Sequence, residues 1–347
     1  MPVLNWLGRA FITAVVAISG QAAAQTSLKV VAPWSNLNAY GKVEQPFWSK
    51  TFGELTGGKV TAQVTSYSEL GLSGVELLRL AKLGVFDIAH IVVGYSVADD
   101  PVIEGLELST LIQDIPTGRQ ALDAYRPAVA ETLLKKHNLV LLGAYPNPSQ
   151  VLYCREPVKA LADLKGRKIR FYGASMNDFV SAAGAVGVSV PLAEVVPSLQ
   201  RGVVDCGITG TLTGYSFKWP EVTKNLYGMR FGWGLTLIAA SKAKWDALPQ
   251  DRQEATRKAI DKLEADLWTL AADDDKAGLD CNTGRAACPY GAPATMTLVE
   301  PSAADEAERK RILQEVVLKK WASRCNKTCI EQWNATIGKV AGVTAAP

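Results

Sequence analysis

Residues 162–209 read ADLKGRKIRFYGASMNDFVSAAGAVGVSVPLAEVVPSLQRGVVDCGIT, and this stretch decides the fold class. It contains short runs with strand character, separated by segments in which apolar residues recur at helical spacing. We expect strands at 168–171, 188–191 and 203–208, and helices at 177–184 and 193–201. Strands that alternate with helices form β-α-β units and build a mostly parallel sheet. The stretch therefore predicts an α/β fold.

A similar alternation occupies the N-terminal part of the chain. We expect strands at 28–32, 59–64 and 87–93, with helices at 41–55 and 75–83 between them. Two α/β sets of this kind predict a two-lobed body with an interlobe cleft. Ligands of open α/β sheets bind in such clefts, beyond the carboxyl ends of the strands.

The chain is expected to cross between the two lobes at two hinges. Strands at 139–144 and 151–154 are separated by Tyr145-Pro146-Asn147-Pro148, which predicts a hinge near Asn147-Pro148. A second crossing is expected near Leu235, and a long helix at 249–272 would support both lobes from behind. The predicted boundaries are lobe I at 25–147 and 236–270, and lobe II with the C-terminal helices at 148–235 and 271–347.

The N-terminal segment has the features of an export signal. Residues 1–24 read MPVLNWLGRAFITAVVAISGQAAA, with one positive charge, a short apolar stretch and a small-x-small cleavage pattern before Gln25. This order is typical of a secretory signal peptide, and the apolar part is too short to span a bilayer. We therefore expect a soluble periplasmic protein; a buried N-terminal helix is the alternative.

Charge and motif content exclude several function classes. The 347 residues carry 37 Lys and Arg against 34 Asp and Glu, a net charge of +3, which argues against nucleic acid as a partner. No G-x-S-x-G, P-loop, H-E-x-x-H or G-x-G-x-x-G motif occurs, and the two histidines, His90 and His137, are interpreted as structural. The sequence therefore predicts a binding protein without a cofactor or metal, and not an enzyme.

The six cysteines are predicted to form three disulfides. An even number in an exported chain is typical of bridges, although six cysteines allow 15 connectivities. Local spacing favours Cys281 with Cys288 and Cys325 with Cys329, which leaves Cys154 with Cys206. The alternative is a structural zinc site, which the absence of a C-x2-C pair does not favour.

Several motifs resemble one protein family. They are DLKGRKIR (163–170), VPLAE (190–194) and LQRGVVD (199–205), preceded by TGGKV (56–60), ELG (69–71) and GVFDI (84–88). In this order they resemble the substrate-binding proteins of the tripartite ATP-independent periplasmic (TRAP) transporters, over roughly residues 28–275. The resemblance implies a two-lobed periplasmic solute-binding protein fold that closes on a small organic acid and delivers it to a TRAP membrane permease. We expect it to be a monomer.

The resemblance also implies an anchor for the ligand. The family's arginine that grips the ligand carboxylate falls on Arg170, the last residue of DLKGRKIR. A planar guanidinium can make two parallel bonds to one carboxylate, which fits this role. Without the resemblance, Arg170 would be interpreted as a solvated residue at the end of a strand.

Other positions depart from the sialic acid binders of the family. Gln150 stands where those proteins carry a second arginine, Thr209 where they carry an asparagine, Cys206 where they carry a glycine, and Leu192 at a position that is often aromatic. These differences argue against sialic acid. They predict a ligand with one carboxylate, contacted through hydroxyl or amide groups by Gln150 and Thr209.

The remaining candidate contacts lie elsewhere in the chain. We expect first-lobe contacts from Trp34 and Asn36 and from the strand end around His90–Tyr95. Trp34 could stack on a ligand ring or pack on its lobe. Trp233 could line the cleft, although packing at the hinge is the favoured interpretation.

Two other functions remain open at this point. A periplasmic ligand sensor would share the fold and the binding site but pass its state to a signalling partner. An exported enzyme on the same fold is the third hypothesis, which the missing catalytic motifs argue against.

Overall fold

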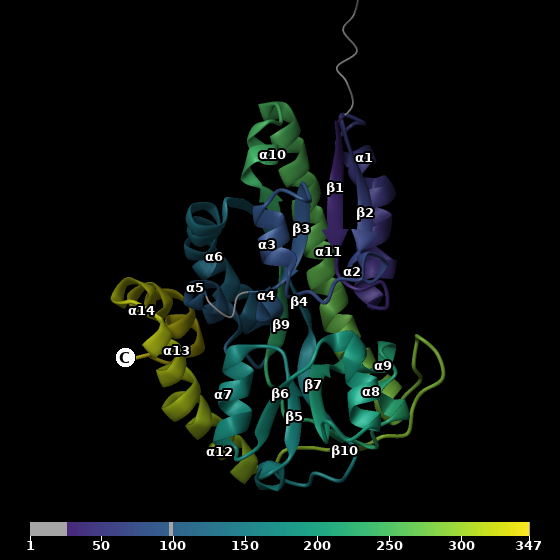
Figure 1. Ribbon diagram of the computed structural model, residues 1–347, viewed down its shortest axis with the longest axis vertical. Helices are drawn as coiled ribbons and strands as arrows, with labels where there is room; N and C mark the ends of the chain where they lie inside the picture. The colour runs from purple at the N-terminus through teal and green to yellow at the C-terminus, as the bar shows by residue number, and fades with distance from the viewer. Residues whose placement is uncertain (1–25, 97–99, 347) are drawn as a thin grey trace, which may run out of the picture.

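The protein is described by a computed structural model that covers residues 26–96 and 100–346. The predicted signal peptide, residues 1–24, lies outside the described residues. Two α/β lobes lie one above the other in Figure 1, with the long helix α11 (Gln250–Thr283) running along both. The α/β class is confirmed. In the described part of the chain no helix is both long and apolar enough to cross a membrane.

Lobe I is the part of the molecule around β1 (Thr26–Ala32), β2 (Val60–Ser66) and β3 (Ile88–Val92). These strands are parallel, in the order β2-β1-β3, as consecutive β-α-β units require. The predicted helix at 41–55 is three consecutive helical segments, at 40–44, 47–51 and 52–55. The helices of this lobe are α1 (Phe52–Leu55), α2 (Tyr67–Leu70), α3 (Leu77–Lys82), α4 (Val93–Ser96), α5 (Pro101–Glu104) and α6 (Ile115–His137), followed later in the chain by α10 (Lys242–Asp246).

Lobe II is the part around β5 (Lys168–Phe171), β6 (Val186–Ser189) and β7 (Cys206–Gly210). These three strands are also parallel, in the order β7-β5-β6. Two short parallel strands, β8 (Asn225–Tyr227) and β10 (Thr297–Val299), extend the sheet. The helices of this lobe are α7 (Ala174–Ala182), α8 (Val195–Gln200) and α9 (Thr211–Ser216).

One long strand joins the lobes where two strands with a break were expected. β4 (Leu139–Cys154) pairs with β9 (Trp233–Ser241) as far as Ser149, and with β7 from Gln150 onward. Its prolines are tolerated because the register with β9 shifts between Pro146 and Ser149, where a proline costs no regular ladder bond. The chain thus passes from one lobe to the other along β4 without leaving the extended conformation.

The long helix begins and ends later than expected. Pro249 is the residue before the helix and not its first residue, and the helix continues to Thr283 before Gly284 ends it in the left-handed conformation, with φ 68°. The apolar stripe fades after Ala271, which is why the sequence predicted an end at 272. The added turns are held by polar contacts instead, such as that of Asp275 with the amide of Ser149, at 3.0 Å.

The C-terminal helices lie along one flank of both lobes, on the left in Figure 1. They are α12 (Ala303–Ile312), α13 (Leu318–Arg324), α14 (Lys327–Trp333) and α15 (Lys339–Ala341), with helical turns at 313–317 and 334–338. The first part packs on α7 of lobe II, and the later part packs on α5 and α6 of lobe I. In lobe I, the indole N–H of Trp333 donates to the carbonyl of Gly105 at 2.9 Å. The predicted boundaries had placed this whole segment with lobe II, whereas it bridges the two.

The three disulfides have the predicted pairing. Cys154 is bonded to Cys206, Cys281 to Cys288, and Cys325 to Cys329, so the structure contains no free cysteine in its described part. The first bridge joins β4 to β7, the strands that also carry Gln150 and Thr209. The zinc alternative has no support, because the described residues hold no group of three or more metal-ligating side chains.

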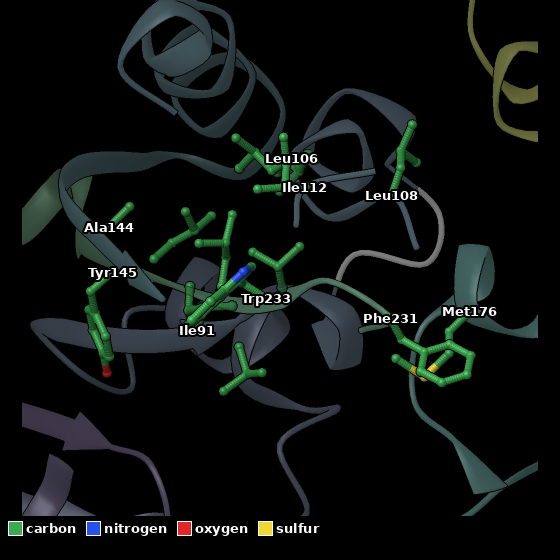
Figure 2. Packing of buried hydrophobic residues seen from close by; sticks show 14 of the residues in the cluster. Ile91, Leu106, Leu108, Ile112, Ala144, Tyr145, Met176, Phe231 and Trp233 are labelled. Carbon is green, nitrogen blue, oxygen red and sulfur yellow. The ribbon is translucent and has the colours of Figure 1, made fainter. Parts of the chain in front are cut away.

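The hydrophobic core is continuous between the lobes. Figure 2 shows part of it, with Trp233 at the centre of the view and Phe231 beside Met176. Trp233 is 9% exposed and sits where β9 leaves the crossing region, so it packs at the expected hinge.

Candidate ligand-binding site

A cavity lies between the two lobes. Side chains from both lobes and from the two connecting strands enclose it. They are Trp34, Leu37, Val92 and Tyr95 from lobe I, Arg170, Tyr172, Leu192, Thr209 and Thr213 from lobe II, and Asn147, Gln150 and Gly234 from β4 and β9.

Arg170 lies on β5 near its carboxyl end, as predicted, but it is not exposed at the edge of the cleft. Its exposed fraction is 0%, because the closed lobes cover it. The guanidinium donates from Nε to the carbonyl of Val190 at 2.9 Å, from Nη1 to the carbonyl of Ile208 at 2.7 Å, and from Nη2 to the hydroxyl of Tyr95. The interpretation as a solvated strand residue is therefore wrong.

The charge of Arg170 has no carboxylate partner in the described part of the chain. Its three acceptors are neutral oxygens, although a buried arginine is ordinarily paired. A guanidinium carries five N–H donors, so one donor on each Nη atom still lacks an acceptor among these contacts. Two such donors match the two oxygens of one carboxylate.

Two stacked tyrosines from opposite lobes cover the arginine. Tyr95 follows β3 and Tyr172 follows β5; their rings stack with centroids 5.0 Å apart and planes 19° apart. The Arg170 guanidinium lies 5.2 Å from the centroid of Tyr172, which adds a cation–π contact. Burial raises the pKa values of both Tyr95 and Tyr172, and the charge of Arg170 opposes both shifts. Both hydroxyls therefore stay protonated at neutral pH.

Gln150, Thr209 and Leu192 lie around this same cavity, as the resemblance implied. Gln150 on β4 and Thr209 on β7 are brought together because these strands pair antiparallel, with Gln150 opposite Gly210. The side-chain amide of Gln150 donates to the carbonyl of Pro148 at 2.9 Å. Leu192 is 4% exposed and supplies an apolar wall.

Trp34 both lines the cavity and packs on its own lobe. Its ring meets Tyr67 and Tyr95 edge to face, at centroid distances of 5.0 and 5.5 Å. The two interpretations of this residue are thus compatible, since one face can pack while the other borders the ligand space.

Three other candidates lie away from this cavity. Asn36 borders a separate groove at the mouth of the cleft, with Asn38 and Tyr290. Trp233 borders the neighbouring cavity described below. His90 is fully buried inside lobe I, with Nδ1 3.0 Å from Glu44 and Nε2 accepting from Trp48 at 3.0 Å, so the expected contacts from this segment come from Val92 and Tyr95 instead.

Sequence reasoning missed Tyr172, Thr213 and Asn147 as site residues. Tyr172 is two positions after Arg170 at the carboxyl end of the same strand, a signal that could have found it. Asn147 was assigned to the hinge. Its side-chain amide is oriented by Gly234 and Thr236 of β9, at 3.2 and 3.1 Å.

A second cavity adjoins the first and shares Gln150 and Tyr172 with it. Glu107, at the end of the helical turn 105–107 in lobe I, lines this cavity. Its Oε2 accepts from the amide of Leu235 at 2.8 Å, and its carboxylate is hydrogen-bonded to the hydroxyl of Tyr172. Burial raises the pKa of Glu107 to about 8.

A mostly apolar cavity with a few polar groups, enclosed between two α/β lobes that β4, β9 and α11 join, is typical of the class of two-lobed solute-binding proteins. The chain belongs to the family described as bacterial extracellular solute-binding protein, family 7, whose model matches residues 34–324. The family resemblance inferred from the motifs is therefore confirmed, and the family consists of receptors and not of enzymes.

Characterised relatives are similar over most of their length. The chain is 25% identical over 268 residues to the sialic acid-binding periplasmic protein SiaP of Vibrio cholerae, which covers 76% of this chain and 81% of that protein. It is 25% identical over 272 residues to the 2,3-diketo-L-gulonate-binding periplasmic protein YiaO of Escherichia coli, covering 78% and 82%. The crystal structure of DctP7, a Bordetella pertussis extracytoplasmic solute receptor binding pyroglutamic acid, matches with a TM-score of 0.80 at 25% identity, covering 90% of this chain and 99% of that one.

Proposed function

We propose that this chain is a periplasmic receptor that binds a small organic acid between its lobes and delivers it to a TRAP-type membrane permease. The observation that carries the proposal is Arg170, a fully buried cation with two unused N–H donors and no carboxylate partner in the described residues. A ligand carboxylate would supply the missing charge and accept both donors.

The geometry supports a role for closure in binding. Tyr95 of lobe I accepts a hydrogen bond from Arg170 of lobe II only when the lobes meet. A carboxylate on Arg170 would neutralise the charge that closure buries, and so favour the closed form over the open one. We place the hinges near Asn147-Pro148 and Leu235, where β4 and β9 cross between the lobes.

The other residues of the proposed ligand site are Gln150, Thr209, Leu192 and Trp34. Gln150 and Thr209 offer an amide and a hydroxyl, while Leu192 and Trp34 offer apolar walls. The relatives bind sialic acid, 2,3-diketo-L-gulonate and pyroglutamic acid, all of which are organic acids, and this supports a ligand of that class. We exclude Asn36 and Trp233 from the proposed set because other cavities contain them.

The proposed location follows from two observations. Relatives along most of the chain are periplasmic proteins, and residues 1–24 have the pattern of a signal peptide. We propose cleavage before Gln25 and a monomeric mature receptor.

Native mass spectrometry of protein purified without added ligand, followed by calorimetry with organic acids, tests the function. We expect a co-purified or added monocarboxylate to bind at one site per chain, and small-angle scattering to show a smaller radius of gyration when it is bound. A protein that binds no organic acid in a broad screen would contradict the proposal. Turnover of a bound acid would instead favour an exported enzyme.

A further inference from the structure

The closed cleft contains two adjoining cavities. The proposed ligand carboxylate accounts for the charged group of only one of them, Arg170. The first contains Arg170, and the second contains Glu107; Gln150 and Tyr172 border both. Tyr172 contacts both ionisable side chains. The Arg170 guanidinium lies over its ring, and the Glu107 carboxyl is hydrogen-bonded to its hydroxyl.

Glu107 lacks a cation in the described structure, as Arg170 lacks an anion. The nearby basic side chain, Arg324, is committed to Glu104 and Asp178, with N–O distances of 2.7 and 3.0 Å. The negative charge of Glu104 adds to the effect of burial on Glu107, and both raise its pKa. A carboxyl that is buried beside another negative charge would be stabilised by a further hydrogen-bond donor or by a positive charge.

The acceptor capacity of Glu107 is only partly used. A carboxylate offers about four lone-pair sites, and the contacts of Glu107 in the described residues are the amide of Leu235 and the hydroxyl of Tyr172. The backbone of Gly94 packs closely against both side chains. A Cβ on Gly94 would lie 2.5 Å from Cε2 of Tyr172 and 2.9 Å from Oε1 of Glu107. Glycine at 94 lets these two side chains from opposite lobes meet.

We propose that Glu107 is a specificity-determining residue, which accepts a hydrogen bond from an N–H group of the ligand while Arg170 holds the ligand's carboxylate. This inference rests on the proposed function and names the ligand class: a small carboxylic acid with an amide or ammonium N–H donor. A second carboxylate is disfavoured, because the closed cleft would then hold two anionic groups against the single charge of Arg170.

Acids matched in ring and carboxylate, in which an oxygen replaces the nitrogen, test the inference; the pyroglutamate pair isolates the donor, whereas the proline and pipecolate pairs also lose the ammonium charge. Calorimetry would compare pyroglutamate with 5-oxotetrahydrofuran-2-carboxylate, proline with tetrahydrofuran-2-carboxylate, and pipecolate with tetrahydropyran-2-carboxylate. In each pair an oxygen replaces the N–H, so the analogue places a lone pair against Glu107. A site built for a donor discriminates strongly against an analogue that lacks it, and we expect at least a tenfold preference for the nitrogen member.

The variant Glu107→Gln sharpens the test, because its carbonyl oxygen can still accept from Leu235 while the side chain can no longer ionise. We expect it to reduce the preference to about threefold or less, and Glu107→Asp to retain more of it. Glu131→Gln is the matched control, since this exposed glutamate of α6 borders neither cavity; it should leave the preference unchanged. Circular dichroism confirms folding of each variant.

Equal binding of both members of a pair by the wild type, or an unchanged preference in Glu107→Gln, overturns the inference. A loss of preference in Glu131→Gln equal to that in Glu107→Gln also overturns it. If none of the six acids binds, the inference fails, while the proposed function stands or falls separately on the wider organic acid screen and on Arg170→Ala.

Discussion

Two arginines lie between the same two lobes, and their surroundings are opposite. Arg324 on the flank binds Glu104 of lobe I through Nη2 and Nε, at 2.7 and 3.1 Å, and Asp178 of lobe II through Nη1 at 3.0 Å. Arg170 in the cleft is more deeply buried, yet its hydrogen bonds in the described residues go only to carbonyl and hydroxyl oxygens.

The acidic side chains show the same contrast. Glu104 and Glu107 are three residues apart; Glu104 is paired with Arg324, and Glu107 has no cation in the described part of the chain. The flank therefore neutralises its own charges and holds the lobes in place. In the cleft, Arg170 and Glu107 have no oppositely charged partner among the described residues. They therefore remain available to interact with a ligand.

The largest effect is expected for Arg170→Ala. Removing one partner of a buried charged pair should cost roughly 2–5 kcal/mol of binding free energy, about thirtyfold or more in affinity. Stability without ligand should change less, because the loss of two carbonyl hydrogen bonds is offset by removal of an unpaired buried charge. Calorimetry with an identified ligand measures the loss, and Arg170→Lys should recover only part of it.

Near-normal affinity of a folded Arg170→Ala protein would mean that the carboxylate is held elsewhere. The matched control is Arg324→Ala, which changes an interlobe arginine that does not border the proposed ligand cavity.

For Arg324→Ala we expect the reverse outcome, a loss of stability with little change in affinity. The side chain of Arg324 is 31% exposed, so the loss should be about 2 kcal/mol, below that of a fully buried pair. Urea denaturation measures it. An affinity change of more than about tenfold would show that the flank also controls the cleft and would weaken the comparison.

Glu107 should make the stability of the unliganded protein depend on pH. Its pKa rises from 4.5 in the unfolded chain to about 8 in the folded one, so the folded state retains a proton that the unfolded state loses. Stability from this group is therefore complete below about pH 4.5 and is lost as the pH rises toward 8. The slope is at most about 1.4 kcal/mol per pH unit for one proton.

Urea denaturation at several pH values, with Glu107→Gln as the reference, isolates this effect. The difference between the two proteins should change steadily between pH 5 and 8 and level off above. A difference that is independent of pH would mean that Glu107 is already ionised in the free protein.

Tyr95→Phe should have the smallest effect. It keeps the stack on Tyr172 but removes the hydroxyl that accepts from Arg170 across the cleft. We expect a loss of about 1 kcal/mol of binding free energy, roughly fivefold in affinity. Stopped-flow fluorescence should place the change in ligand release, since the contact exists only in the closed form; a change confined to association would contradict this assignment.

Local patterns predicted much of the fold because their causes are local. The alternation of strands and helices in residues 162–209 predicted the parallel units of lobe II, and the spacing of the cysteines predicted the three bridges. The patterns failed where distant contacts replaced local signals. β4 continues through its prolines because β9 and β7 pair with it, and α11 continues beyond residue 272 because polar partners such as Ser149 hold its last turns.

By itself the sequence determined the α/β class through its periodicity, favoured the cysteine pairing that the structure confirms, and pointed to Arg170 through a family motif. Only the tertiary structure decided which charged side chains have an oppositely charged partner. Glu104 and Glu107 look alike in the sequence, but the partner of Glu104 stands 220 residues away at Arg324, and Glu107 meets Tyr172 from the opposite lobe. Whether a buried charge has a partner depends on what folding brings within a few ångströms of it, and for Arg170 and Glu107 that left room for a ligand.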